Sequence, residues 1–170
     1  VSIMWMVAGW DKFRSSNRYQ EFITRISNDI PMKVYGKFTN APYLKKYVYD
    51  GSMASSLEVS TAIRKNGIYL LTHSDSHIKS GVPTLRIFEA AAANAVVISD
   101  KHPFAMKHFG DNFLYFDQTA DAETMYQQVK SHYDWIQANP EKAKAMASRA
   151  HNIFLEKFTL EKDLSRIAKM

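Results

Sequence analysis

Short apolar runs along the chain predict a series of buried strands separated by helices. The runs are rich in β-branched and aromatic residues and end at glycine, proline, asparagine or aspartate. They predict about six strands, at residues 3–8, 32–35, 47–49, 68–71, 95–98 and 113–116. Between them, residues 39–46 are expected to be irregular and residues 72–80 to form a polar loop.

Helical periodicity appears in the segments between these runs. Ser15, Ser16 or Asn17 is expected to cap the first helix, and its buried stripe recurs every three or four residues, at Tyr19, Phe22, Ile23 and Ile26. The other predicted helices cover residues 55–65, 84–93, 102–109, 121–138, 141–157 and 160–170. Alternating strands and helices predict an α/β fold, a Rossmann-like doubly wound parallel sheet of about six strands with C-terminal helices. In such a fold, ligands bind at the carboxyl ends of the strands.

Residues 79–100 are the most informative stretch. Gly81 is expected to form a turn and Pro83 to lie in the first turn of the following helix, which contains four consecutive alanines, residues 90–93. These small side chains would let the helix lie close to the sheet. Asn94 can take the left-handed conformation that ends a helix. A buried strand then ends at Asp100, which is also a candidate cap for the next helix.

Composition narrows the class of protein. The chain has 170 residues, 46% of them hydrophobic and 23% charged, as expected of one globular domain. It contains no cysteine, no apolar run of membrane-spanning length and no recognisable signal peptide, and we expect a cytoplasmic protein. The net charge of +5 favours an anionic ligand, but the basic residues are dispersed, which argues against nucleic acid.

The segment Gly81-Val82-Pro83-Thr84-Leu85-Arg86-Ile87-Phe88-Glu89-Ala90, followed by residues 94–100, resembles a known family. It is similar to the C-terminal, donor-binding domain of GT-B glycosyltransferases, in particular to the "glycosyl transferases group 1"-like group typified by the spore-maturation protein CgeB. The resemblance extends as a pattern over nearly the whole chain. It implies that this chain is the C-terminal half of a longer two-domain enzyme and cannot transfer sugar alone.

The resemblance also implies roles for individual residues. Glu89 would accept hydrogen bonds from the ribose of a nucleoside-diphosphate sugar, with Arg86 near the phosphates or paired to Glu89. The backbone N–H groups of Val82, Thr84 and Leu85 would face the diphosphate, a role that helix physics supports independently. Gly81 stands where many retaining enzymes carry the first of two glutamates. Lys79 or Asp75 could supply that sugar contact instead.

Further candidates follow the other strands. Arg14 is our first candidate, and Lys12 our second, for neutralising the diphosphate beyond the end of the first strand. His73 directly follows a predicted strand and could contact the donor sugar or phosphate, which we favour over a metal site formed with Asp75 and His77.

Candidates for binding the base end two other predicted strands. Tyr35 and Gly36 close the second strand and Met53 follows the third. Backbone groups there could contact a base edge and the tyrosine ring could stack on it, although ordinary turn chemistry with a core tyrosine explains the same residues.

The expected partners are a nucleotide-sugar donor and, through an N-terminal domain outside this chain, an acceptor glycan, lipid or protein. Peripheral membrane association of the full-length protein is possible on this interpretation, and neither a cofactor nor an essential metal is expected. The alternative is a non-catalytic flavodoxin-like binding or regulatory domain. No Gly-x-Gly-x-x-Gly, P-loop or Gly-x-Ser-x-Gly motif is present, which disfavours dinucleotide oxidoreductases, P-loop NTPases and α/β-hydrolases.

Overall fold

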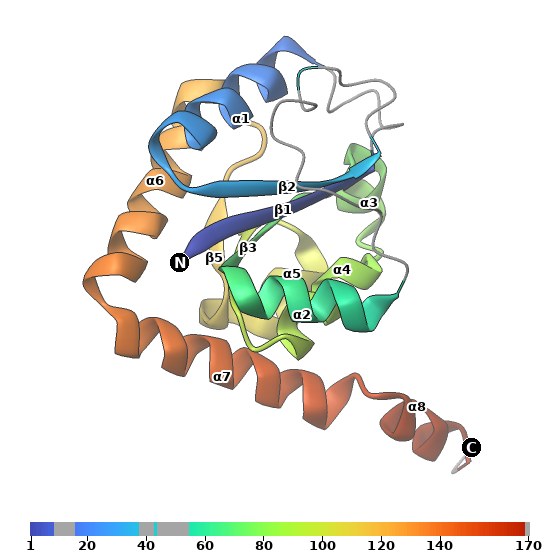
Figure 1. Ribbon diagram of the computed structural model, residues 1–170. Helices are drawn as coiled ribbons and strands as arrows, with labels where there is room; N and C mark the ends of the chain where they lie inside the picture. The colour runs from blue at the N-terminus through green and yellow to red at the C-terminus, as the bar shows by residue number, and fades with distance from the viewer. Residues whose placement is uncertain (9–15, 38–42, 44–54, 169–170) are drawn as a thin grey trace.

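The protein contains a five-stranded parallel sheet with helices on both faces (Figure 1). The structure is a computed structural model and describes residues 1–8, 16–37, 43 and 55–168. The strand order is β2-β1-β3-β4-β5, where the strands are β1 (Ser2–Ala8), β2 (Met32–Lys37), β3 (Gly67–Leu71), β4 (Val96–Asp100) and β5 (Leu114–Phe116). The α/β class and the doubly wound parallel sheet are therefore confirmed. The strand expected at residues 47–49 lies outside the described residues.

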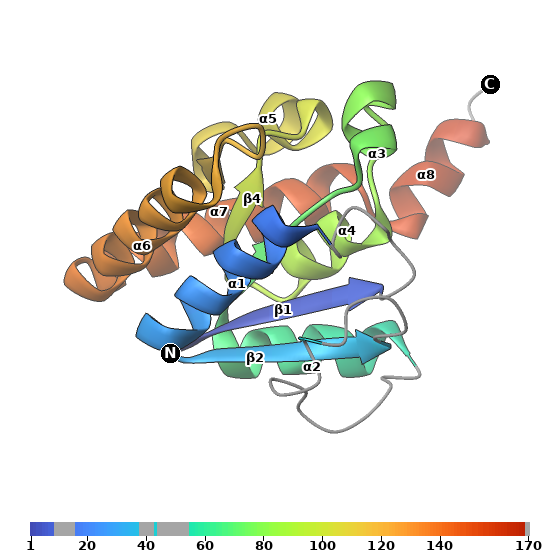
Figure 2. The ribbon, with the colours of Figure 1, turned by 90° about the horizontal axis from the view of Figure 1, so that it is seen from above.

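The helices form two layers. They are α1 (Asn17–Asp29), α2 (Ser56–Asn66), α3 (Asp75–Ser80), α4 (Leu85–Ala92), α5 (Pro103–Phe109), the short 3-10 helix η3 (Gly110–Asn112), α6 (Ala122–Ala138), α7 (Pro140–Lys157) and α8 (Leu160–Ile167). Helices α1 and α6 cover one face of the sheet, and α2, α4 and α5 cover the other (Figures 1 and 2). Helix α7 contributes to both cores, through Ala143 and Met146 on one side and Ala150 on the other.

The alternation of side chains along β1 explains the two cores. Ile3, Trp5 and Val7 point to the layer of α1 and α6, and Met4 points to the layer of α2 and α4. Both Met4 and Trp5 are fully buried, as expected for a central strand of a sheet covered on both faces. The indole N–H of Trp5 donates to Thr72 Oγ1 at 3.0 Å, just beyond β3.

Residues 75–80 form helix α3, so the prediction of a loop through residues 72–80 is wrong there. Ser74 supplies the N-cap, since its hydroxyl oxygen accepts the His77 backbone N–H. Gly81, with a φ of 68°, ends the helix in the left-handed conformation. The segment carries no buried residue and therefore no apolar periodicity that the sequence could reveal.

Helix α4 begins at Leu85, with Thr84 as an extended N-cap, so the prediction that Pro83 lies in its first turn is wrong. Residues 82–84 instead connect the end of α3 to α4. The expectations for the alanines of this helix and for Asn94 are confirmed. Ala90 and Ala91 are buried against the sheet layer, and Asn94 has a positive φ of 54°.

Gly36 lies in β2 beside the backbone of β1. It pairs in register with Val7 and has a φ of 140°. A Cβ atom at this position would lie 1.9 Å from the Val7 carbonyl oxygen, which belongs to the backbone of the neighbouring strand. Only glycine fits this position without moving a strand.

We predict that Gly36→Ala destabilises the domain by about 3 kcal/mol or more, because it adds a backbone clash to an unfavourable φ. Gly110→Ala is the matched control, since Gly110 also has a positive φ, of 47°, but open space around its Cβ position. Urea unfolding of the two variants measures the difference. Equal losses of unfolding free energy would show that the contact with Val7 contributes nothing.

Candidate functional site

Glu89 is a buried carboxylate close to the start of α4. Its residue is 4% exposed, and its Oε2 atom accepts a hydrogen bond from the guanidinium of Arg86, one turn earlier on the same helix. Its Oε1 atom is also buried but has no hydrogen-bond partner among the described residues. A buried carboxylate oxygen without a donor is costly, so this position is suited to a ligand that brings hydroxyl groups.

A groove of about 390 Å³ opens beside this carboxylate. Its walls come from the first turns of α2, the outer face of α4 and the end of α7, and they are mostly apolar. The lining residues are Ser56, Ser60, Leu85, Phe88, Glu89, Ala92, Phe154 and Phe158. A concave, largely apolar site with a few polar groups is what a small organic ligand requires.

The N-terminus of α4 is open at one end of this groove. Leu85, which is also a lining residue, is 62% exposed, and Thr84 caps the helix without a side-chain hydrogen bond. Helix geometry leaves the N–H groups of Leu85 and Arg86 without an intrahelical acceptor, a combination that favours an anion. The Val82 N–H, by contrast, donates to Ser80 Oγ at 3.3 Å, so in this structure it is already engaged.

The other predicted site residues are distributed around this end of the sheet. Lys79 is exposed on α3, and Gly81 closes that helix. Tyr35 is 8% exposed and belongs to the core on the α4 side, beside Gly36 in β2. Arg14, Lys12 and Met53 lie outside the described residues.

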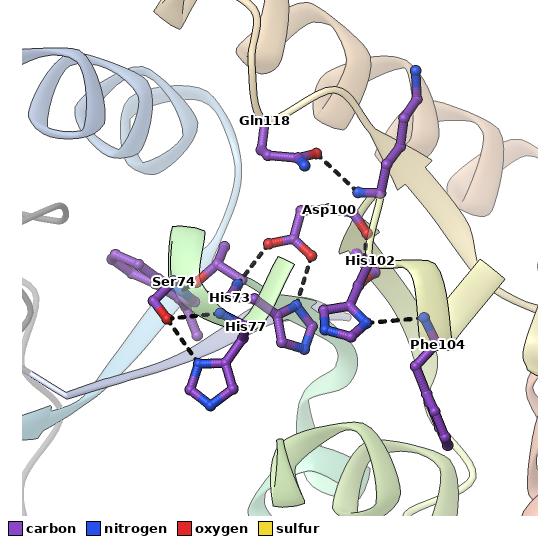
Figure 3. A network of polar contacts seen from close by, with 11 residues as sticks. His73, Ser74, His77, Asp100, His102, Phe104 and Gln118 are labelled. Carbon is purple, nitrogen blue, oxygen red and sulfur yellow. Dashed lines mark hydrogen bonds and ion pairs between the residues drawn. The ribbon is translucent and has the colours of Figure 1, made fainter. Parts of the chain in front are cut away.

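His73 is held in the interior by Asp100. The Asp100 carboxylate accepts the His73 backbone N–H at Oδ2 and contacts the His73 ring nitrogen Nδ1 through Oδ1, both at 2.6 Å (Figure 3). Both side chains are fully buried. In this position the His73 ring presents no atom to solvent. The sequence placed both residues at strand ends, and the parallel pairing of β3 with β4 brings those ends together.

His102, which the sequence analysis did not single out, extends this network (Figure 3). Its ring lies 4.2 Å from that of His73, centroid to centroid, and its Nδ1 atom accepts the Phe104 N–H at 3.1 Å. His102 is therefore the side-chain cap of α5, and the expectation that Asp100 caps this helix is wrong. Asp100 is instead occupied with His73.

The suggested metal group does not converge. His73 contacts Asp100, His77 contacts Ser74 at 2.7 Å, and Asp75 is exposed. Within the described part of the chain, no group of three or more histidine, cysteine, aspartate or glutamate side chains is arranged to hold a metal ion.

Burial, together with the neighbouring His73, lowers the pKa of His102 below its ordinary value of 6.5, although Asp100 and the backbone carbonyls of Val82 and His77 act in the opposite direction. The folded protein then binds fewer protons at this residue than the unfolded chain as the pH falls below about 6.5. Stability from this residue is complete above that pH and decreases as the pH falls toward the folded pKa. Protonation at Nδ1 would also remove the cap of α5.

We predict that wild-type protein loses more thermal stability between about pH 7.5 and 5.5 than His102→Asn, because the asparagine cannot take up a proton. Melting temperatures measured across this range check the prediction. Burial also lowers the pKa of His108, but that residue is present in both proteins and its effect cancels in the comparison. Parallel pH profiles would contradict the assignment.

Comparison with known proteins assigns the chain to a family. The chain resembles the crystal structure of the C-terminal domain of a group 1 family glycosyltransferase, LpcC, from Francisella tularensis, with a TM-score of 0.63 and 16% identity over 94% of this chain and 87% of that one. At this identity the likeness shows the fold. No curated protein matches significantly. The family model described as glycosyl transferase-like matches residues 14–169, and the chain therefore belongs to the glycosyl transferase-like family.

Proposed function

We propose that this glycosyltransferase domain binds a nucleoside-diphosphate sugar at the start of α4. The observation that carries the proposal is the buried Oε1 atom of Glu89, which has no hydrogen-bond partner among the described residues. Glu89 lines the groove, and the N-terminus of α4 is open at one end of that groove. The ribose hydroxyls would donate to Glu89, while the hydrogen bond from Arg86 orients the carboxylate. The family match favours this function over that of a non-catalytic regulatory domain.

The diphosphate would lie against the N-terminus of α4, with Thr84 and Leu85 nearest to it. Lys12 and Arg14 would neutralise it, because they follow β1 and the carboxyl ends of parallel strands share one edge of the sheet. Lys79 would contact the donor sugar in place of the glutamate that Gly81 replaces. Tyr35, Gly36 and Met53 remain candidates for binding the nucleobase. His73 would act from beneath the site, because its ring is buried.

The domain would form the C-terminal half of a GT-B enzyme. A second domain would bind the acceptor and supply the general base, and stabilisation of the leaving diphosphate by cations and helix N–H groups would make an essential metal unnecessary. We place the enzyme in the cytoplasm. Among the described helices, none has the length and apolar character to span a bilayer.

We predict that the wild-type domain binds at least one of UDP, GDP, ADP, CDP and dTDP, and that Glu89→Gln weakens this binding by roughly 1.5–3 kcal/mol, the range for a hydrogen bond to a charged group. Glutamine keeps the volume of the buried side chain but removes its charge and replaces one acceptor oxygen with an N–H donor. Titration calorimetry on folded protein measures both affinities.

Glu141→Gln is the matched control, because Glu141 also pairs with a cation three residues away but is exposed on α7. We expect it to bind as tightly as wild type. Absence of binding to every diphosphate at millimolar concentration would contradict the proposed function. Equal affinity of Glu89→Gln and wild type would return Glu89 to a structural pairing with Arg86.

We also predict that the isolated domain transfers no sugar. Transfer requires an acceptor oxygen aligned with the donor carbon and, for inversion, a base within reach of its proton. Of the three candidate acids after the strands, Glu89 is assigned to the ribose, Asp100 is buried against His73, and Asp75 is exposed on α3. Incubation with labelled nucleotide sugars and candidate acceptors tests this. Transfer above the rate of donor hydrolysis would show that the site is complete without a second domain.

A further inference from the structure

Two of the helices that form the groove beside Glu89 each carry a cationic or ring N–H side chain just beyond the part that lines it. On α2, Ser60 lines the groove, and Arg64 lies one turn further along the same face. On α7, Phe154 lines the groove, and His151 lies one turn before it on the same face. The two walls therefore continue past the groove through these two side chains.

Both side chains bind the backbone at the C-terminal end of α4. The Arg64 Nε–H donates to the Ala93 carbonyl at 3.2 Å, and His151 Nδ1 lies 3.1 Å from the Ala91 carbonyl oxygen, which also accepts the Asn94 N–H. Because a carbonyl can only accept, His151 Nδ1 carries a proton and donates it. Donors of this kind satisfy the carbonyls that a helix end leaves free. The end of α4 is thus bonded to both neighbouring walls.

These bonds are important because the inner face of α4 is smooth. Apart from Ile87 and Glu89, its buried side chains are the methyl groups of Ala90 and Ala91, which make few contacts and offer little resistance to sliding along the sheet. Hydrogen bonds are directional and fix the helix along its axis. The two bonded carbonyls lie only about 3 and 6 Å beyond Glu89 along that axis, so a shift there would move the carboxylate with them.

We propose that Arg64 and His151 are positioning residues for the donor ribose, holding α4 between α2 and α7 so that Glu89 meets the ribose hydroxyls. This inference rests on the proposed function. Neither residue lines the groove, and each acts through a backbone carbonyl of α4. Hydrogen bonds to hydroxyls depend steeply on distance and angle, whereas attraction of the diphosphate changes slowly with distance. Loss of either bond should therefore weaken the ribose contact most.

A nucleoside diphosphate and its 2′,3′-dideoxy form isolate this contact. The two ligands share the base and the diphosphate and differ only in the sugar hydroxyls offered to Glu89. The probe is the tightest binder of the five diphosphates named above. Titration calorimetry gives the ratio of the two dissociation constants. We expect wild type to favour the hydroxylated ligand about tenfold or more, as for hydrogen bonds to a charged group.

His151→Leu and Arg64→Met remove the two donors, whereas His151→Asn keeps an N–H donor at the place of Nδ1. His132→Leu is the matched control. His132 also contacts a backbone carbonyl, that of Tyr115 at 2.8 Å, but it belongs to α6, on the other face of the sheet. Circular dichroism first shows that each variant is folded. Arg64→Met, at a residue exposed on α2, decides the question if His151→Leu does not fold.

We expect His151→Leu and Arg64→Met to lower the ratio about threefold to tenfold, as for one weakened hydrogen bond, with unchanged affinity for the dideoxy ligand. His151→Asn and His132→Leu should keep the wild-type ratio. An unchanged ratio in His151→Leu or Arg64→Met would overturn the role of that residue, and a reduced ratio in His151→Asn would overturn the role of the hydrogen bond.

Equal losses of affinity for the two ligands would also overturn the proposal, because they indicate a general loss of stability. These outcomes leave the proposed function intact, since wild type still distinguishes the ligands. Wild-type protein that binds no diphosphate, or binds both forms equally, would contradict the placement of the ribose at Glu89 itself, and the role of Arg64 and His151 would fail with it.

Discussion

One buried carboxylate joins the two central strands of the sheet at the edge where the ligand is expected. A fully buried aspartate must find donors inside the protein, and Asp100 finds both on His73. This is geometrically possible because β3 and β4 are parallel neighbours in register and their ends lie together. The segments that leave these ends, toward α3 and toward α5, start beside this pair.

The helix that carries Glu89 is anchored separately, by aromatic contacts on its outer side. The Phe88 ring lies 5.7 Å from that of Phe104 on α5 and 5.3 Å from that of Phe158 just after α7. Edge-on and tilted contacts of this kind stabilise a pair beyond the area they bury. Ring packing therefore holds the wall that Glu89 lines.

The hydrophobic pattern was sufficient for the sheet and for most of the helices, because buried strands and amphipathic helices leave different periods in the sequence. Local signals also located the left-handed Asn94 and the Arg86–Glu89 pair, whose spacing places both on one face of a helix. Helix α3 could not be found this way, since it is short, exposed and defined by a cap and a glycine. Pro83 was misplaced for a related reason. Helix α3 ends at Ser80 and is closed by Gly81, so α4 begins only at Leu85, beyond the proline.

The partnership of His73 and Asp100 depends on information that no local pattern carries. The two residues are 27 positions apart, and only the strand order makes them neighbours. His102 was overlooked because the sequence analysis placed it inside the predicted helix and assigned the cap to Asp100, whereas histidine is not among the preferred N-cap residues. Its contact with the His73 ring, by contrast, depends on the folded chain alone.

The alanine face of α4 has a consequence for how this domain can vary. Ala90 and Ala91 let the helix lie close to the sheet, because their buried side chains are single methyl groups. A bulkier residue there would displace the whole rigid helix, and the displacement would reach Glu89 and the free N–H groups at the other end. Substitutions at these two positions are therefore constrained in two ways. The dense core leaves no room for a larger side chain, and a displaced helix would misplace the proposed binding site, although neither residue touches that site.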